Sequence, residues 1–277
     1  MTTMIKIALI QMCATPDVEA NMAMTLRQVT SAAEQGAKIV FLPEAFAFIG
    51  PDRENRVILE SLADTADVAR PILEKCQEIA SQHGIHLVLG GFHEVSDDPE
   101  RSYNTCVHLG TDGAILARYR KMHLFDVELA DGTFLKESKG TLAGSLPVIT
   151  DTPFGCLGLT ICYDVRFPNL YQKLVDMGAI ALSVPSAFTA TTGAAHWHTL
   201  LRARAIESQC YVIAAAQYGN HHGRRYSYGH SLVVDPWGEI IAEAATDDAV
   251  LIADIDPARV QQVRSELPSL QHRRALN

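Results

Sequence analysis

The chain has 277 residues, of which 48% are hydrophobic and 20% are charged, a balance typical of a globular protein that excludes a disordered one. Its formal net charge of −9 argues against binding to nucleic acid or to an anionic membrane surface, because both need clustered Lys and Arg. The six cysteines show neither C-x-x-C spacing nor paired Cys and His runs. This argues against a structural zinc site and a disulfide framework, and favours a reducing cytoplasm.

Segments typical of strands and helices alternate along the first half of the chain. The apolar run at residues 5–12 is short and is interrupted by Lys6 and Gln11, so it predicts a strand and not a signal peptide. No run approaches the roughly 20 apolar residues that cross a bilayer, so no membrane association is expected. The other predicted elements are a helix at 21–35 with Asn21 as its N-cap, a strand at 39–42, a helix at 70–83, a strand at 86–90, and a hairpin of 103–109 with 114–119.

The second half of the chain continues the alternation and ends in a helix. Antiparallel hairpins between early and late helices predict an α/β fold in which sheets pack face to face with helices outside. No internal repeat or linker interrupts the pattern, so a single domain over residues 1–277 is expected. The predicted elements are strands at 146–150 and 156–161, a helix at 168–177, a strand at 180–185, a helix at 195–208, strands at 211–216, 231–235, 239–244 and 250–254, and a helix at 257–266.

Cys162 is the first candidate for chemistry. It follows an apolar run at residues 157–161 and precedes a predicted helix that begins at Pro168. A nucleophile on a tight strand-to-helix turn is exposed at the end of the sheet, near helical N–H groups. Those donors would lower the pKa of the thiol, and the N–H of Tyr163 would hold an oxyanion. From position alone, however, a Cys that ends a strand is more often a small buried hydrophobic residue.

Two charged side chains that follow predicted strands could act with this cysteine. Glu44 comes directly after the strand at 39–42, between apolar residues, and desolvation would raise its pKa towards neutrality, which suits a general base. Lys121 lies at the end of a hairpin strand, where its charge could stabilise an oxyanion or a thiolate. Taken singly, the glutamate could equally cap a helix or pair with an Arg, and the lysine could be a surface charge.

Other polar residues carry weaker signals. Glu137 would be a solvated loop charge on composition alone. His196 and His198 are two apart on a predicted helix, so they point to different faces and are not expected to bind a metal together. The sequence has no G-x-S-x-G, H-E-x-x-H, G-x-x-x-x-G-K-[ST] or G-x-G-x-x-G motif. Serine hydrolase, zincin and nucleotide-binding functions therefore lack support.

Three segments taken together resemble the nitrilase superfamily of carbon–nitrogen hydrolases. They are residues 42–44, 119–126 and 159–168, which contain Glu, Lys and Cys in the order of that family. The resemblance runs from about residue 5 to about residue 274, nearly the whole chain. Three separate motifs in the correct order rarely arise by chance. Catalytic roles are therefore favoured for Glu44, Lys121 and Cys162 over the purely structural roles considered above.

The resemblance implies a fold and a set of roles. The fold would be a four-layer α-β-β-α sandwich that forms a homodimer or a higher homo-oligomer. Cys162 would attack the carbonyl carbon of a small-molecule amide, and Glu44 would move the proton and later activate water. Lys121 and the Tyr163 N–H would stabilise the oxyanion, while Glu137 would position the substrate and orient the lysine. No metal or organic cofactor is implied.

Three regions in the C-terminal third of the chain resemble particular branches of the superfamily. Residues 185–197 are similar to the branch that acts on ω-amides of α-keto acids, which implies that Phe188 and Thr189 contact substrate. Residues 214–231 and 267–274 are more similar to the deaminated glutathione amidases, which release α-ketoglutarate and cysteinylglycine.

Deaminated glutathione has a carboxylate at each end, so two cationic anchors are expected. Arg166 is the candidate for the α-keto acid end, and Arg225, in a polar loop at residues 221–225, for the cysteinylglycine end. That loop could equally be a solvated surface turn. The main alternative function is an ω-amidase acting on α-ketoglutaramate or α-ketosuccinamate. A true nitrilase fits the flanking motifs less well, and a catalytically silent scaffold is disfavoured by the intact Glu, Lys and Cys.

Overall fold

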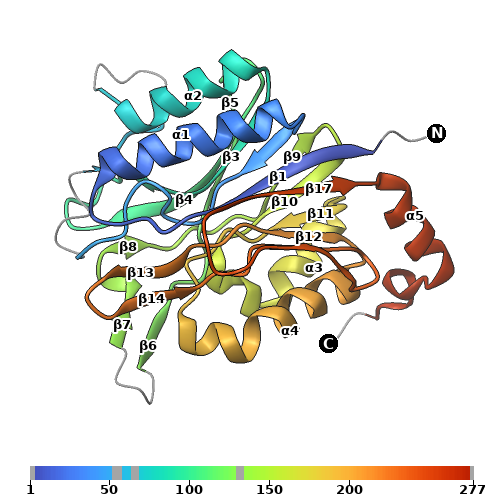
Figure 1. Ribbon diagram of the computed structural model, residues 1–277. Helices are drawn as coiled ribbons and strands as arrows, with labels where there is room; N and C mark the ends of the chain where they lie inside the picture. Colours follow the sequence, from blue (N-terminus) through green and yellow to red (C-terminus); the bar gives the residue numbers. More distant parts are fainter. Residues whose placement is uncertain (1–3, 52–57, 64–68, 129–133, 275–277) are drawn as a thin grey trace.

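Two β-sheets lie face to face at the centre of the computed structural model, which describes residues 4–51, 58–63, 69–128 and 134–274. Figure 1 shows α1 and α2 on one outer side of the sheets and α3 and α4 on the other. The predicted α-β-β-α sandwich is therefore confirmed. The helices are α1 (Val18–Glu34), α2 (Pro71–His83), α3 (Pro168–Asp176), α4 (Ala190–Ser208) and α5 (Pro257–Glu266), with 3-10 turns at Glu137–Lys139, Cys162–Arg166 and Ser269–His272.

The first sheet has seven strands, and α1 and α2 cover its outer face. Its central trio β1, β2 and β3 is parallel, and the flanking pairs β17 with β1, β3 with β4 and β4 with β5 are antiparallel. The strands in spatial order are β17 (Ala249–Ile255), β1 (Ile5–Gln11), β2 (Ile39–Phe41), β3 (His86–Glu94), β4 (Ser102–Leu109) and β5 (Ile115–Arg120), with β8 (Thr141–Leu142) also paired to β4.

The second sheet has six strands and repeats this plan, with β10, β11 and β12 as its parallel trio. Its order is β16 (Ile240–Glu243), β15 (Leu232–Val234), β12 (Tyr211–Ala214), β11 (Ala181–Ser183), β10 (Gly155–Leu159) and β9 (Val148–Thr152). Two antiparallel ribbons lie outside the sheets: β6 (Asp126–Glu128) with β7 (Phe134–Lys136), and β13 (Tyr218–His222) with β14 (Arg225–Tyr228).

The central strands are buried on both faces, because helices cover one face of each sheet and the other sheet covers the second. Along β1, Ile7 and Leu9 pack between the sheets, while Ala8 and Ile10 pack under the helices. Since strand side chains alternate between faces, such a strand needs a continuous apolar run.

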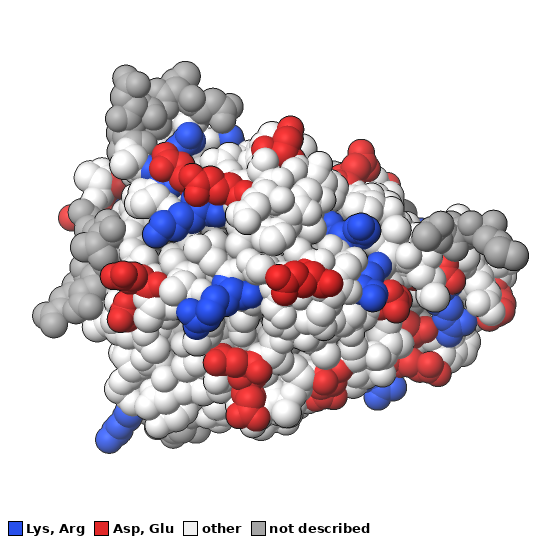
Figure 2. Space-filling model, turned by 45° about the horizontal axis from the view of Figure 1, so that its top comes forward, with Lys and Arg blue, Asp and Glu red and all other residues white. Residues whose placement is uncertain are grey.

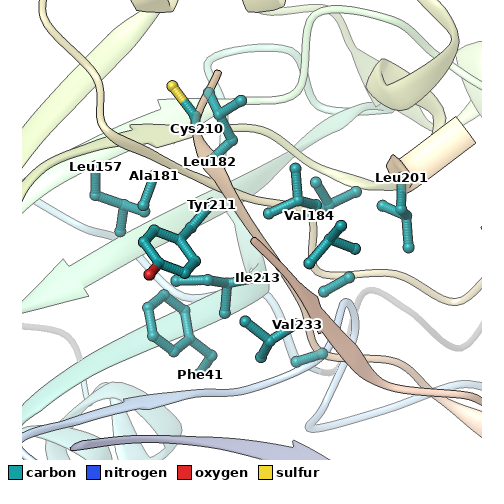
Figure 3. Close-up of a cluster of buried hydrophobic side chains, with 14 of the residues drawn as sticks. Phe41, Leu157, Ala181, Leu182, Val184, Leu201, Cys210, Tyr211, Ile213 and Val233 are labelled. Carbon is teal, nitrogen blue, oxygen red and sulfur yellow. The ribbon is translucent and has the colours of Figure 1, made fainter. Parts of the chain in front are cut away.

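The core between the sheets joins strands that are far apart in the sequence. Figure 3 shows part of this core, where Phe41 of β2 lies beside Tyr211 and Ile213 of β12. This packing fixes the position of one sheet on the other, and so fixes the distance between the loops that follow their strands.

Three local expectations differ from the structure. Helix α1 is capped by Asp17, whose side chain accepts a hydrogen bond from the Ala20 N–H, so Asn21 as N-cap was wrong. Asn21 instead donates from Nδ2 to the Ala47 carbonyl at 2.9 Å. Helix α4 begins at Ala190, five residues before the predicted start at 195. The polar loop predicted at residues 221–225 is the β13–β14 ribbon, whose two tight strands bury one face.

Charged side chains of both signs are interspersed on the face shown in Figure 2, and they form no continuous basic surface there. Within the described ranges, no helix has the length and the apolar character required to span a bilayer.

Candidate active site

Two of the site residues lie where parallel strands of the two sheets end. Glu44 follows β2 of the first sheet, and Cys162 follows β10 of the second. Lys121 comes directly after β5, and Glu137 begins the 3-10 turn after β7. The carboxyl ends of parallel strands are the usual place for a ligand site in α/β proteins. The structure brings together all four residues that the sequence singled out for catalysis.

The nucleophile turn is held in an unusual backbone conformation. Cys162 has a φ of 47°, in the left-handed region, and such a non-glycine residue costs about 1 to 3 kcal/mol. Its N–H donates to the Pro185 carbonyl at 2.9 Å, which ties the turn to the loop after β11. The fully buried Asp164 accepts bonds from the Ile161 N–H at 2.9 Å and the Tyr119 hydroxyl at 2.7 Å. These bonds offset the strain and place the sulfur at the sheet end.

Glu44 is buried, and its carboxylate accepts three hydrogen bonds. Its Oε1 accepts from Lys121 Nζ at 3.0 Å and from Asn104 Nδ2 at 2.9 Å, and its Oε2 accepts from the Ala187 N–H at 2.9 Å. The Cys162 thiol lies close enough to this carboxylate for each group to shift the pKa of the other. The glutamate therefore lies between the sulfur and the ammonium group, as a proton carrier for the sulfur must.

Close backbone packing supports this position of Glu44. A Cβ atom on Gly90 would lie 2.1 Å from the Leu42 carbonyl oxygen, so only glycine allows β3 to approach the loop that carries Glu44. Gln217 supports the same loop from the other sheet, donating from Nε2 to the Glu44 carbonyl at 3.0 Å.

Lys121 lies between two carboxylates in the interior. Its Nζ is 3.0 Å from Glu44 Oε1 and 2.9 Å from Glu137 Oε2, and its side chain is only 2% exposed. Glu137 is fixed in turn, because its Oε2 accepts the Phe125 N–H at 2.7 Å. A buried ammonium needs such partners, since an unpaired charge in the interior is strongly destabilising.

The pKa of Glu44 is shifted in the direction opposite to the sequence expectation. Burial by itself raises the pKa, but the charge of Lys121 and the hydrogen bonds from Cys162, Ala187 and Lys121 together lower it below its ordinary value. The expected rise towards neutrality was wrong, because the local sequence does not show the buried cation beside the carboxylate. Glu44 is therefore ionised at neutral pH.

The pKa shift of the Cys162 thiol was also predicted in the wrong direction. Burial and the negative charge of Glu44 raise the pKa of the Cys162 thiol well above its ordinary value, although Lys121 lowers it in part. The predicted depression by helical N–H donors does not dominate. At neutral pH the sulfur is therefore a thiol beside a carboxylate, so the proton must leave as the sulfur attacks.

Two residues near the reacting groups gave no signal in the sequence. Asn104 of β4 donates from Nδ2 to Glu44 at 2.9 Å and to Glu137 at 3.4 Å, and so links both carboxylates. His93 of β3 is directly opposite Asn104 in the antiparallel register, and opposed residues share a face. Both resemble ordinary strand residues in sequence, and only the pairing of β3 with β4 shows their place.

The predicted substrate-binding residues differ in how they relate to the four catalytic residues. The N–H of Tyr163 has no acceptor in the described protein outside its own helical turn, so it is free to donate to an oxyanion. The Arg166 guanidinium lies 5.8 Å from the Tyr163 ring centroid and 5.0 Å from that of Phe188. No carboxylate of the described residues forms an ion pair with Arg166.

The remaining predicted substrate-binding residues are Phe188, Thr189 and Arg225. Phe188 is buried, with its ring 5.1 Å from that of Trp197. The Thr189 hydroxyl bonds to the Thr192 hydroxyl at 2.7 Å at the start of α4. Arg225 begins β14, and its charge acts on His93, whose pKa is lowered to about 4, chiefly by burial. The structure shows no contact between these three residues and the sulfur.

The neighbouring His221 is not a solvated loop residue. It is buried, its Nδ1 lies 2.7 Å from the Ala14 carbonyl and its Nε2 lies 2.7 Å from the Ser227 hydroxyl. The β13–β14 ribbon is therefore attached to the start of the chain and held in place beside Arg225.

Comparison with known proteins agrees with this geometry. Residues 6–265 match the model of the carbon-nitrogen hydrolase family. The deaminated glutathione amidase of Bos taurus is 46% identical over 273 residues, which cover 97% of this chain and 81% of the bovine one. The chain belongs to the carbon-nitrogen hydrolase family. The family prediction made from three short motifs is thus confirmed.

Solved structures resemble the whole chain. The Caenorhabditis elegans NitFhit protein superposes with a TM-score of 0.89 at 44% identity, covering 99% of this chain and 66% of the NitFhit chain. Nit3 of Saccharomyces cerevisiae, a member of branch 10 of the nitrilase superfamily, has a TM-score of 0.85 at 32% identity and covers 96% of this chain and 94% of the Nit3 chain.

Proposed function

We propose that the protein hydrolyses the amide bond of deaminated glutathione to give α-ketoglutarate and cysteinylglycine, through a thioester on Cys162. The observation that carries the proposal is the burial of Cys162, Glu44 and Lys121 together, with Glu44 Oε1 3.0 Å from Lys121 Nζ and its charge acting on the Cys162 thiol. The name of the bovine relative supports the substrate, since the identity extends over nearly the whole chain.

The first half of the reaction forms the thioester. Cys162 Sγ attacks the amide carbonyl carbon while Glu44 takes the thiol proton. The Lys121 ammonium and the Tyr163 N–H stabilise the oxyanion of the tetrahedral intermediate. Collapse of this intermediate breaks the C–N bond, and Glu44 gives its proton to the departing amine of cysteinylglycine. An amine is a poor leaving group unless it is protonated, so a base that returns its proton is essential.

The second half releases the acid. Glu44 accepts a proton from water, whose oxygen attacks the thioester carbon. The second tetrahedral intermediate expels the Cys162 thiolate, which recovers a proton from Glu44, and α-ketoglutarate leaves. Splitting amide hydrolysis in this way replaces one difficult step by two easier ones.

The substrate is tested by kcat/KM for deaminated glutathione and for α-ketoglutaramate, measured on the same preparation. We expect the ratio to favour deaminated glutathione, and Cys162→Ala to abolish both activities. A ratio that favours the smaller amide would replace the proposed substrate by that of an ω-amidase, with the mechanism unchanged. Loss of neither activity in Cys162→Ala would reject the thioester mechanism.

Arg225 is proposed to bind the carboxylate at the cysteinylglycine end. Its charge acts on His93, which pairs with Asn104 in the β3–β4 register, and this proximity supports a position near the substrate. We expect Arg225→Ala to lower kcat/KM for deaminated glutathione about tenfold, as for a lost charge-assisted hydrogen bond. The kcat/KM for α-ketoglutaramate should hardly change, because this smaller molecule does not reach Arg225.

The exposed neighbour Arg224 provides the matched control, because Arg224→Ala removes the same charge from the same turn. Equal losses on both substrates in Arg225→Ala would remove this residue from substrate recognition.

We further propose that two copies of the chain associate, within the cytoplasm that the six free cysteines favour. Large apolar side chains are exposed on the second sheet side, where Ile206 is 48% and Trp237 49% exposed. They are neighbours, since Ile206 packs against Gly238. Light scattering of the purified protein should give the mass of a dimer, and Ile206→Lys should lower it. A monomeric wild-type protein would contradict this assignment.

A further inference from the structure

Three metal-ligating side chains converge where α4 meets β15 and β16 of the second sheet. His198 comes from the middle of α4, His230 directly precedes Ser231 at the entry to β15, and Glu243 ends β16. One ligand atom from each lies within 4.8 Å of the other two. His198 Nε2 and His230 Nδ1 are both 2.9 Å from the same oxygen, Oε1 of Glu243.

The surrounding structure holds this cluster in place. His230 has a φ of 56°, and its carbonyl accepts the Trp197 indole N–H at 2.8 Å. Its ring lies 4.5 Å from that of Tyr228. Because Trp197 is fully buried, the position of His230 is fixed by the core and not by solvent-exposed contacts. The three side chains are 25% to 34% exposed, so an ion could enter from solvent.

The charge and the donor types suit one class of ion. Two imidazoles and a carboxylate are ligands that bind Zn²⁺, and a water molecule would complete the tetrahedron. No Lys or Arg of the described residues forms an ion pair with Glu243, whose partners are the two histidines. Ligand atoms of a tetrahedral Zn²⁺ lie about 3.3 Å apart, so each N···O distance would lengthen by about 0.4 Å.

We propose that His198, His230 and Glu243 form a Zn²⁺ site that clamps α4 to the β15–β16 hairpin. The residue before His198 is Trp197, which packs on Phe188, and Phe188 lies under the Arg166 guanidinium. The ion therefore stabilises the helix that supports one wall of the candidate active site. Its role is structural, and it takes no part in the reaction at Cys162.

The test is a Zn²⁺ titration by isothermal calorimetry on full-length, tag-free protein that carries Cys162→Ala, so that the candidate nucleophile cannot bind the ion. We expect one equivalent to bind. In the same background, His198→Ala, His230→Asn and Glu243→Gln should each weaken binding about tenfold or more. His272→Ala, which removes an exposed histidine outside the cluster, should leave binding unchanged.

The variants are chosen to keep the fold. Glu243→Gln is isosteric, and Asn tolerates the left-handed backbone of position 230. Circular dichroism in the presence of EDTA identifies any variant that fails to fold, and the two conservative variants then decide the question. Added Zn²⁺ should raise the Tm of the Cys162→Ala protein but not that of its Glu243→Gln derivative. Absence of binding, or equal binding by all the variants, would overturn the proposal.

Discussion

Replacing Glu44 with Gln is expected to lower kcat/KM for the amide substrate about a thousandfold while the protein stays folded. The amide keeps the size of the side chain, and Lys121 retains Glu137 as a counter-charge at 2.9 Å. What is lost is the carboxylate beside the Cys162 thiol that serves as its base. The measurement is steady-state kinetics on purified protein, with circular dichroism as the check on folding.

A second observable separates loss of the base from general damage. The negative charge of Glu44 helps to raise the pKa of Cys162, whereas Lys121 lowers it. In Glu44→Gln the thiol should therefore become more acidic although hydrolysis is lost. The rate of alkylation by iodoacetamide, followed against pH, should show its midpoint shifted to lower pH. An unchanged midpoint would contradict the assigned contact between sulfur and carboxylate.

Glu94→Gln is the matched control for this variant. Glu94 is also buried and also pairs with a cation, Arg120, at 2.7 Å, but it does not contact the sulfur. This control should lose stability and keep its kcat/KM, within a few fold. Comparable loss of activity in both variants would mean that buried charge in general, and not the base, had been removed.

The same pKa shift gives the expected pH dependence of the wild-type protein. Since Glu44 titrates below its ordinary value of 4.5, activity should not fall as pH is lowered from neutrality to that value. The stabilisation that the carboxylate contributes is complete above 4.5 and is lost as pH falls through the lowered pKa. Lys121 has a pKa raised well above 10.5, so its contribution is complete below that pH and is lost only as pH rises through the raised value.

Lys121→Met is expected to damage both activity and stability. Met has a similar length but no charge, so Glu44 and Glu137 would remain in the interior without their shared cation. Breaking a buried ion pair from one side costs about 3 to 5 kcal/mol. Denaturant unfolding followed by fluorescence measures the loss, and kcat/KM should fall below detection because the oxyanion also loses its cation.

A double variant tests the reason for this loss. Adding Glu137→Gln removes one of the two unpaired carboxylates, so Lys121→Met with Glu137→Gln should be more stable than Lys121→Met alone, yet still inactive. Lys139→Met changes an exposed lysine near Glu137 and should have little effect on either property. If the double variant were no more stable than the single one, the two buried carboxylates left without their cation would not explain the loss of stability.

The boundaries of most elements follow from local patterns, with identifiable exceptions. The strand in the run at residues 5–12 and the helix at 257–266 were predicted within one residue, because apolar runs and a proline at the first helical position act locally. The start of α4 was placed five residues late, since the small and polar residues of its first turn give no apolar period. The β13–β14 ribbon was missed because its burial comes from contacts with Ala14, which is distant in the sequence.

The sequence by itself determined the family and the residue types of the candidate site, because the three motifs around Glu44, Lys121 and Cys162 are short, ordered and each local. It also determined the alternation of helices and strands. The tertiary structure alone decided which further groups join the site, as Asn104 does through the pairing of β3 with β4. It also decided the direction of both pKa shifts. The physical reason is that a pKa depends on every charge and dipole within a few ångströms, and in the interior those neighbours come from distant parts of the chain.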